Sequence, residues 1–263
     1  MDALFIDSHL HLQNERYQGR QAEVIQRART KGVGLLYCNG TCEADWAEVL
    51  KLAAHHPEVI PFLGIHPWEA DRASPNWEKK LYDLLKNEPV GIGEIGLDRR
   101  CPVAPQQQEH VFVRQLKMAI ELDRPLTIHC LNAWGRLLEI LDGLQAKLPP
   151  MMIHSFNGSA EIMAQLLKRG AHISFSARLA EQPKLANCCR SIPADRLLLE
   201  TDSPDQLRRS LCPEAEDGAL NEPYLIPRLY RLAATIRGGK HDKLRQQVYN
   251  NGTFFAHSLF SRR

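Results

Sequence analysis

The chain has 263 residues, of which 44% are hydrophobic and 24% charged, a composition typical of a soluble globular protein. Its 33 basic and 31 acidic side chains nearly cancel, which argues against a protein that coats nucleic acid through a large excess of positive charge, although local basic clusters remain open. The N-terminal segment MDALFIDSHLH does not look like a secretory signal, and no stretch reaches the roughly 20 apolar residues that cross a bilayer, so we expect no membrane partner.

Short apolar runs alternate with longer amphipathic runs along the chain. The short runs predict strands at 3–8, 33–39, 59–65, 89–95, 125–130, 150–155, 171–176 and 196–201. The stretches between them predict helices at 20–31, 43–55, 75–87, 105–123, 133–146, 159–169 and 182–190, and two further helices at 222–237 and 240–259. Strands that alternate with helices of this length are typical of βαβ units around a parallel sheet.

Eight such strands predict an α/β fold of the (β/α)8 TIM-barrel type, which takes about 250 residues. A doubly wound open sheet is the alternative architecture. No linker rich in Pro, Gly or Ser divides the chain, so we expect residues 1–263 to form a single domain. The seven cysteines are an odd number and do not suggest a disulfide framework; they indicate reduced, mostly buried thiols in a cytoplasmic protein.

Side chains of the kinds that bind metals fall where several of the predicted strands end. They are His9, His11, Glu94, His129, His154 and Asp202. The carboxyl ends of all the strands of a parallel barrel meet at one face, so these side chains would converge there. A two-metal site can be assembled in this way from residues far apart in sequence.

Each of these residues also has an ordinary structural interpretation when it is taken alone. His9 and His11 are two residues apart and share a strand face, which is also common on a solvated strand end. Glu94 follows a run that should be buried, where a carboxylate needs either a cation or a salt bridge. A lone strand histidine is usually a hydrogen-bonded core residue, and an aspartate before Ser203-Pro204 is usually a helix cap. Only the joint placement favours a metal site.

Several motifs resemble the TatD family of metal-dependent hydrolases, in the wider amidohydrolase superfamily. They are FIDSHLH, LGIHPW, GEIGLD, the region 107–116, LTIHC, IHSFNG, LLLETDSP, NEP at 221–223, and Asn251 with Phe254. These stretches run in the family's order from residue 5 to residue 255, nearly the whole chain. The resemblance implies a (β/α)8 barrel that binds one or two divalent cations and hydrolyses phosphodiesters, commonly as a deoxyribonuclease.

The resemblance also implies roles for individual residues. His9, His11 and Asp202 would hold one cation, His129 and His154 a second, and Glu94 would bridge the two. Glu200 would orient one of these ligands from behind, and His66 would contact the substrate, although His66 is equally typical of a cap for the loop before Pro67. Mixed histidine and carboxylate ligands suit Zn²⁺, Mn²⁺, Mg²⁺ or Fe²⁺.

The chain departs from the family at Leu131, because the family usually carries an arginine two residues after the histidine that matches His129. If that arginine holds a phosphate, its loss weakens the expectation of nuclease activity more than that of metal binding. Other arginines follow predicted strands and could compensate through bidentate contacts to phosphate, although a single loop arginine is usually just solvated. They are Arg99, Arg100, Arg178, Arg208 and Arg209. Trp68 and Trp134 could stack on exposed bases.

We therefore expect a divalent-metal-dependent hydrolase that cleaves single-stranded DNA, with Asp202 as the base and Glu94 as the second catalytic carboxylate. Its expected substrate-binding residues are His66, Arg99, Arg100 and Arg178. The expected partner is a nucleic-acid end, without an obligate protein partner. Leu131 leaves open a hydrolase of a small ester, amide or lactone, and a non-catalytic metal-binding barrel is a third interpretation.

Overall fold

The computed structural model describes residues 4–144 and 146–260. Residue 3 of the predicted first strand and residue 145 of the predicted fifth helix lie outside this description. The strands are β1 Phe5–Leu10, β2 Val33–Asn39, β3 Val59–Leu63, β4 Gly91–Asp98, β5 Leu126–Leu131, β6 Met151–Ile153, β7 His172–Phe175 and β8 Leu197–Leu199. Each strand pairs in parallel with the next one along the chain, from β1 to β8.

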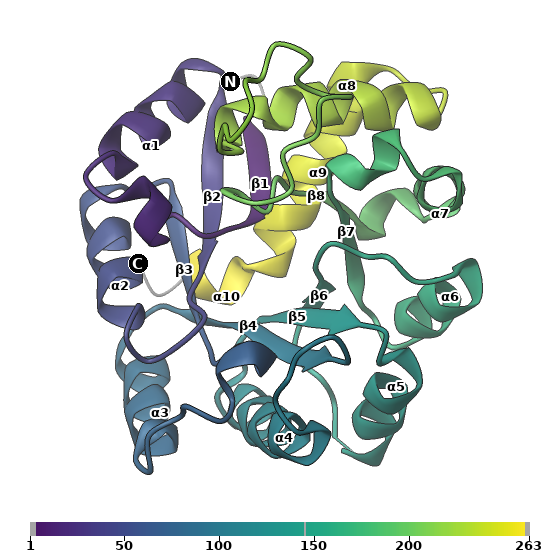
Figure 1. Ribbon diagram of the computed structural model, residues 1–263. Helices are drawn as coiled ribbons and strands as arrows, with labels where there is room; N and C mark the ends of the chain where they lie inside the picture. The colour runs from purple at the N-terminus through teal and green to yellow at the C-terminus, as the bar shows by residue number, and fades with distance from the viewer. Residues whose placement is uncertain (1–3, 145, 261–263) are drawn as a thin grey trace.

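Helices surround the strands as an outer ring (Figure 1). The helices of this ring are α1 Gln21–Thr30, α2 Trp46–His55, α3 Trp77–Asn87, α4 Pro105–Leu122, α5 Trp134–Gly143, α6 Ala160–Lys168, α7 Pro183–Ser191 and α8 Ile226–Ile236. Two further helices, α9 His241–Phe255 and α10 His257–Phe260, lie inside the ring in this view. Short 3-10 helices lie at η1 Glu15–Tyr17, η2 Pro67–Glu69, η3 Ala177–Ala180, η4 Ala194–Arg196 and η5 Pro223–Leu225. The predicted (β/α)8 TIM barrel is confirmed, and the doubly wound sheet is wrong.

Hydrogen bonds between the carboxyl end of β1 and the segment that follows β8 close the barrel. The Asp202 amide donates to the carbonyl of His9 over 3.0 Å, and the His11 amide donates to the carbonyl of Ser203 over 2.8 Å. The buried Asp7 carboxylate accepts from both the amide and the hydroxyl of Thr201, at 2.9 and 2.5 Å. These bonds place His9 and His11 beside Asp202.

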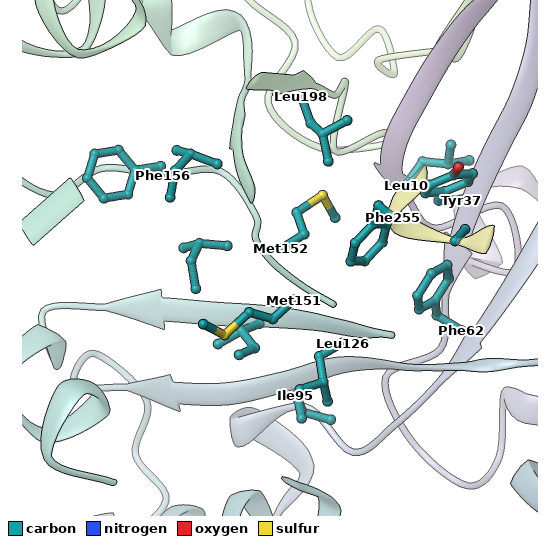
Figure 2. Close-up of a cluster of buried hydrophobic side chains, with 14 of the residues drawn as sticks. Leu10, Tyr37, Phe62, Ile95, Leu126, Met151, Met152, Phe156, Leu198 and Phe255 are labelled. Carbon is teal, nitrogen blue, oxygen red and sulfur yellow. The ribbon is translucent and has the colours of Figure 1, made fainter. Parts of the chain in front are cut away.

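Helix α9 packs against the end of the barrel where the strands begin. Its Phe255 ring stacks on Phe62 with centroids 5.9 Å apart and lies 6.2 Å from the ring of Tyr37. Asn251 donates to the carbonyl of Leu197, at the start of β8, over 2.8 Å. Figure 2 shows Phe255 beside Phe62 and Tyr37 in this apolar cluster, which leaves the opposite end of the barrel for polar chemistry.

The strand boundaries differ from the sequence prediction mainly at the carboxyl ends. Strand β4 continues to Asp98, three residues beyond the predicted end, because Leu97 and Asp98 still pair with β5. Strands β6 and β8 have three residues each, so His154 and Asp202 follow their strands in loops. All seven cysteines are free thiols. Among the described residues, no helix has both the length and the apolar character needed to cross a membrane.

Candidate metal centre

Four possible ligand atoms converge at the mouth of the barrel, from β1 and the residue that follows it, from β4 and from the loop after β8. The Nε2 atoms of His9 and His11 lie 3.2 Å apart. Each of them lies 3.3 Å from Oε2 of Glu94 and 3.6 Å from Oδ1 of Asp202. A tetrahedral cation with nitrogen and oxygen ligands at about 2.0–2.2 Å separates its ligands by about 3.3–3.6 Å. These side chains therefore fit one divalent cation.

A second group faces the other oxygen of the same carboxylate. Oε1 of Glu94 lies 2.8 Å from Nε2 of His154 and 2.9 Å from Nδ1 of His129. Those two nitrogens are 3.1 Å apart. His66 approaches from the loop after β3, with its Nε2 atom 3.4 Å from the same oxygen. Glu94 thus presents one oxygen to each group, as a carboxylate that bridges two cations would.

Acceptors behind the histidines fix which ring nitrogen carries the proton. Nδ1 of His11 lies 2.8 Å from the carbonyl oxygen of Asn39. Nε2 of His129 lies 3.3 Å from Oδ2 of Asp98, and Nδ1 of His154 lies 3.2 Å from Oε1 of Glu200. A nitrogen that donates to such an acceptor leaves the opposite nitrogen of the ring unprotonated. In all three rings that opposite nitrogen faces Glu94.

His66 has a different protonation pattern from the other histidines. Its Nδ1 atom accepts a hydrogen bond from the Trp68 amide at 3.3 Å and caps η2, so the neutral ring carries its proton on Nε2. A protonated nitrogen donates a hydrogen bond and does not bind a cation. The cap interpretation of His66 is therefore seen in the structure, while its Nε2–H still points toward Glu94.

The electrostatics of these groups favour positive charge between them. Burial raises the pKa of Glu94, but the charges of His154, His66 and His9 outweigh burial and lower that pKa well below its usual value. Burial lowers the pKa of His11, whereas hydrogen bonds to Asp202 and Glu94 raise it to about 10. Glu94 therefore stays ionised, and the imidazole of His11 holds a positive charge. A bound cation would supply that positive charge in place of the proton.

A cleft of about 910 Å³ opens above these groups, at the carboxyl ends of the strands. The side chains that line it include His11, Glu94, His129, His154, Asp202 and Arg178. Leu131, at the end of β5, also lines it, so the position where the family usually carries an arginine faces the cleft. Arg178 follows β7 and is half-buried.

The remaining predicted arginines lie at different distances from the cleft. Arg100 is exposed but near enough for its charge to lower the pKa of Arg178, as Arg208 does more strongly, after the larger effect of burial. Arg99 lines a separate small cavity beside Glu109 and is not brought to the metal ligands. Arg209 pairs with Asp217 at the surface.

The two predicted stacking tryptophans are in different environments. Trp68 in η2 exposes 47% of its surface. Trp134 at the start of α5 is half-buried, with its ring 5.3 Å from that of the buried Phe156. Trp134 therefore packs against the core, and Trp68 is the one of the two that remains open to a ligand.

The sequence prediction missed two side chains that contact the ligand set. Asp98 bonds His129, and strand periodicity could have revealed it, since residues 94 and 98 of β4 share a face. Gln206 donates through Nε2 to Oδ2 of Asp202 and to Oγ of Ser155, the latter over 2.9 Å. It lies in an irregular loop with a positive φ of 56°, where no pattern signals a role.

Comparison with known proteins gives consistent similarities over nearly the whole chain. Residues 6–255 match the family described as TatD related DNase. A protein named 3'-5' ssDNA/RNA exonuclease TatD from Escherichia fergusonii is 32% identical over 237 residues, which cover 88% of this chain and 91% of the relative. Its namesake from Pantoea ananatis is 34% identical over 251 residues, covering 93% and 96%. The structure of YJJV, a TatD homolog from Escherichia coli K12, matches with a TM-score of 0.86 at 27% identity, covering 96% of this chain and 97% of that one.

Proposed function

Because this chain belongs to the family of TatD related DNases, we propose that it is a divalent-metal-dependent nuclease that hydrolyses phosphodiester bonds at the ends of single-stranded DNA. The observation that supports this most directly is Glu94, whose two oxygens face two separate groups of imidazoles. We also propose that residues 1–263 act as one domain and that the enzyme works in the cytoplasm.

The side chains suit two cations that share Glu94. His9, His11 and Asp202 would hold the first cation, and His129 and His154 the second. Zn²⁺, Mn²⁺ and Mg²⁺ are the candidate ions, because imidazole suits the first two and carboxylates suit all three. When bound, such cations lower the pKa of a coordinated water and polarise a phosphodiester oxygen.

The protein's own groups would then align and deprotonate the attacking water. Oδ1 of Asp202 faces the imidazoles of His9 and His11, so it is placed to accept a proton there. The amide of Gln206 holds the other oxygen, Oδ2, and fixes the direction of the carboxylate. Glu200 orients His154 through a hydrogen bond and also accepts from the Ser155 amide at 2.6 Å.

Cationic and donor groups of the cleft would hold the phosphate. Arg178 lines the cleft itself, and Arg100 supports the same positive region from the β4–α4 loop. Nε2–H of His66 can donate to a phosphate oxygen or to Glu94. A role for Arg99 stays a prediction, because its side chain lines a separate cavity.

Replacing Asp202 tests the proposed mechanism. Asp202→Asn keeps the shape but removes the basic carboxylate, so hydrolysis of a single-stranded oligonucleotide should fall by about 10²–10⁴-fold. Much of the metal affinity should survive, measured by elemental analysis after dialysis. Asp142→Asn, at the exposed ion pair with Arg169, is the matched control and should cleave normally. Wild-type rates in the Asp202 variant would show that the base is assigned wrongly.

The two other interpretations have little in their favour. A hydrolase of small esters, amides or lactones is favoured only by the apolar Leu131 in the cleft wall. Relatives named as nucleases cover most of the chain and outweigh that single position. A non-catalytic barrel is not favoured either, because all six expected ligand positions are filled and converge.

A further inference from the structure

Trp68 combines an exposed ring with a fixed edge. The chain has four tryptophans; Trp46 and Trp77 are buried at 3% and 6% exposure, and Trp134 packs on the core. Trp68 exposes 47% of its surface, yet its Nε1–H donates to Oδ2 of Asp98 over 2.8 Å. Because the hydrogen bond uses the edge of the indole, it leaves the ring faces available for stacking.

The segment that carries Trp68 is held at several points. The amide of His66, directly before η2, donates to the carbonyl of Thr41 over 2.8 Å. The side-chain amide of Gln107 in α4 donates to the carbonyl of Ala70 over 3.0 Å. The ring therefore sits on a fixed loop, and a fixed aromatic surface loses little conformational entropy when a ligand stacks on it.

Asp98 connects this ring to the candidate metal centre. Its Oδ2 atom, which accepts from Trp68, also lies 3.3 Å from Nε2 of His129. Its Oδ1 atom accepts from the Arg100 amide at 2.7 Å, and Gln108 bonds its backbone at 2.9 and 3.1 Å. Asp98 is 3% exposed, so the carboxylate has one orientation, set by three groups that bond its oxygens and by the Gln108 bonds to its backbone.

We propose that the indole of Trp68 stacks on the nucleobase next to the scissile phosphate. We propose also that Asp98 is a positioning residue, whose carboxylate fixes the orientations of the Trp68 indole and the His129 imidazole. This inference rests on the proposed nuclease function and adds a base-binding subsite to it. Continuous contacts run from Glu94 through His129 and Asp98 to the indole, so a base on the ring belongs to a nucleotide whose phosphate reaches the centre. Stacking accepts any base, so the subsite would read the presence of a base rather than the sequence.

Removal of the ring should separate binding from turnover. Trp68→Ala should raise KM for decathymidylate by about 5- to 150-fold, the range that corresponds to one lost base stack of about 1–3 kcal/mol, and change kcat by less than about threefold. Trp68→Phe should recover part of the loss. Phe254→Ala removes the ring of an equally prominent exposed aromatic, 67% exposed and beside His172 at the foot of the barrel, and should change neither constant.

An oligonucleotide that lacks bases supplies the matched substrate. A chain of abasic residues carries the same phosphates but nothing to stack, so Trp68→Ala should leave its KM unchanged. Acrylamide quenching of tryptophan emission gives a readout without turnover: in the Asp202→Asn background with Mg²⁺, decathymidylate should protect the exposed emission and the abasic chain should not. Trp68→Ala should abolish this protection.

Asp98→Asn tests the positioning role. One side-chain oxygen of Asp98 accepts from both the indole and the imidazole, and the other accepts from the Arg100 amide. Asparagine puts an NH₂ donor in place of one of these oxygens and removes the negative charge beside His129. Divalent-cation affinity should therefore fall by about 10- to 100-fold, as when a partner of a metal-binding histidine is lost. Acrylamide access to Trp68 should rise in the metal-free protein. Trp68→Ala should leave cation affinity within about twofold, which separates the two roles.

Three failures can be told apart. If wild-type protein cleaves decathymidylate and Trp68→Ala keeps its KM and its protection from acrylamide, the base subsite is wrong and the nuclease stands. If wild-type protein does not cleave single-stranded DNA with Mg²⁺, Mn²⁺ or Zn²⁺, the proposed function fails and the subsite fails with it. Unchanged cation affinity in Asp98→Asn would refute the positioning role alone.

Discussion

Arg178 lines the cleft, and no carboxylate oxygen of residues 4–144 and 146–260 lies within 4 Å of its guanidinium nitrogens. Two other arginines of this region have acidic neighbours: Arg16 lies 2.8 Å from Asp205, and Arg208 lies 3.7 Å from Glu181. Burial and the charges of Arg208 and Arg100 lower the pKa of Arg178, so its positive charge is held at a cost in free energy. An anionic ligand would offset that cost.

The family usually carries an arginine at the position of Leu131, and Arg178 could do its work in this chain. Moving the guanidinium from position 178 to position 131 tests this. Arg178→Ala should lower kcat/KM on single-stranded DNA by about 10- to 100-fold, because a hydrogen-bonded charge pair to phosphate is lost. Leu131→Arg should recover part of that activity in the Arg178→Ala background, since residue 131 lines the same cleft. The measurement is kcat/KM of the wild type, the two single variants and the double variant, which gives the coupling free energy between positions 131 and 178.

Arg169→Ala, at the exposed pair with Asp142, is the control for a lost surface arginine and should behave as wild type. Equal activity of Arg178→Ala and wild type would remove Arg178 from the phosphate site. A double variant no better than Arg178→Ala would show that position 131 cannot serve the phosphate in this chain.

Single residues differ in how far their sequence context predicts them. The six predicted ligands lie close together, as their residue types and their positions at strand ends predicted. His9 and His11 are two residues apart, as the strand period requires of side chains on one face, and their Nε2 atoms lie 3.2 Å apart. Arg99 and Arg100 look alike in sequence, yet the cavity beside Glu109 takes only Arg99. A loop side chain's direction depends on its own dihedral angles, which no periodicity encodes.

At the scale of elements, the approach of β4 to β5 brings Glu94 and His129 together. Gly96 pairs with His129, and a Cβ built on Gly96 would lie 1.9 Å from the carbonyl oxygen of His129. Gly96 also has a φ of 152°, which side chains of other residues rarely adopt. The two strands can carry their ligands this close only with glycine at this position.

Gly96→Ala should therefore damage stability and the site at once. The clash and the unfavourable φ should lower the free energy of unfolding by about 3–5 kcal/mol, measured by urea denaturation. Cation affinity should fall as well, because β4 and β5 move apart. Gly135→Ala, in α5 with no atom within 4 Å of the added Cβ, is the control and should leave both quantities near wild type. A Gly96→Ala protein with normal cation affinity would contradict this account.

The order and type of the elements could be predicted, but some of their ends could not. Strand β2 spans the predicted residues 33–39, because its apolar run ends at a clear turn signal. Around the site, four non-glycine residues have positive φ, and no sequence pattern announces such backbone. They are Asn132, Ser155, Asp202 and Gln206, and all but Asn132 line the cleft. The loops that carry the chemistry are thus the least predictable part of the chain.

At the scale of the whole molecule, the family expected from the motifs is confirmed, and so is the barrel that unites them. Conversely, the number and identity of the cations stay predictions. The ligand set comes from β1, β4, β5 and the segments just after β1, β6 and β8, so it spans residues 9 to 202. Cations bound there would link β1 and the loop after β8 with β4, β5 and the loop after β6.

Bound cations should therefore stabilise the entire barrel. A ligand at about 100 times its Kd adds about 2.7 kcal/mol to the free energy of unfolding. For a chain of this size that corresponds to a rise in Tm of about 5–10 °C over the protein in EDTA. Calorimetry with Zn²⁺, Mn²⁺ and Mg²⁺ would rank the ions by their shifts. Glu94→Gln removes the carboxylate shared by both groups, so its own shift should shrink to less than half. No shift with any of the three ions would contradict a cation centre, since a site that binds only the folded chain must stabilise it.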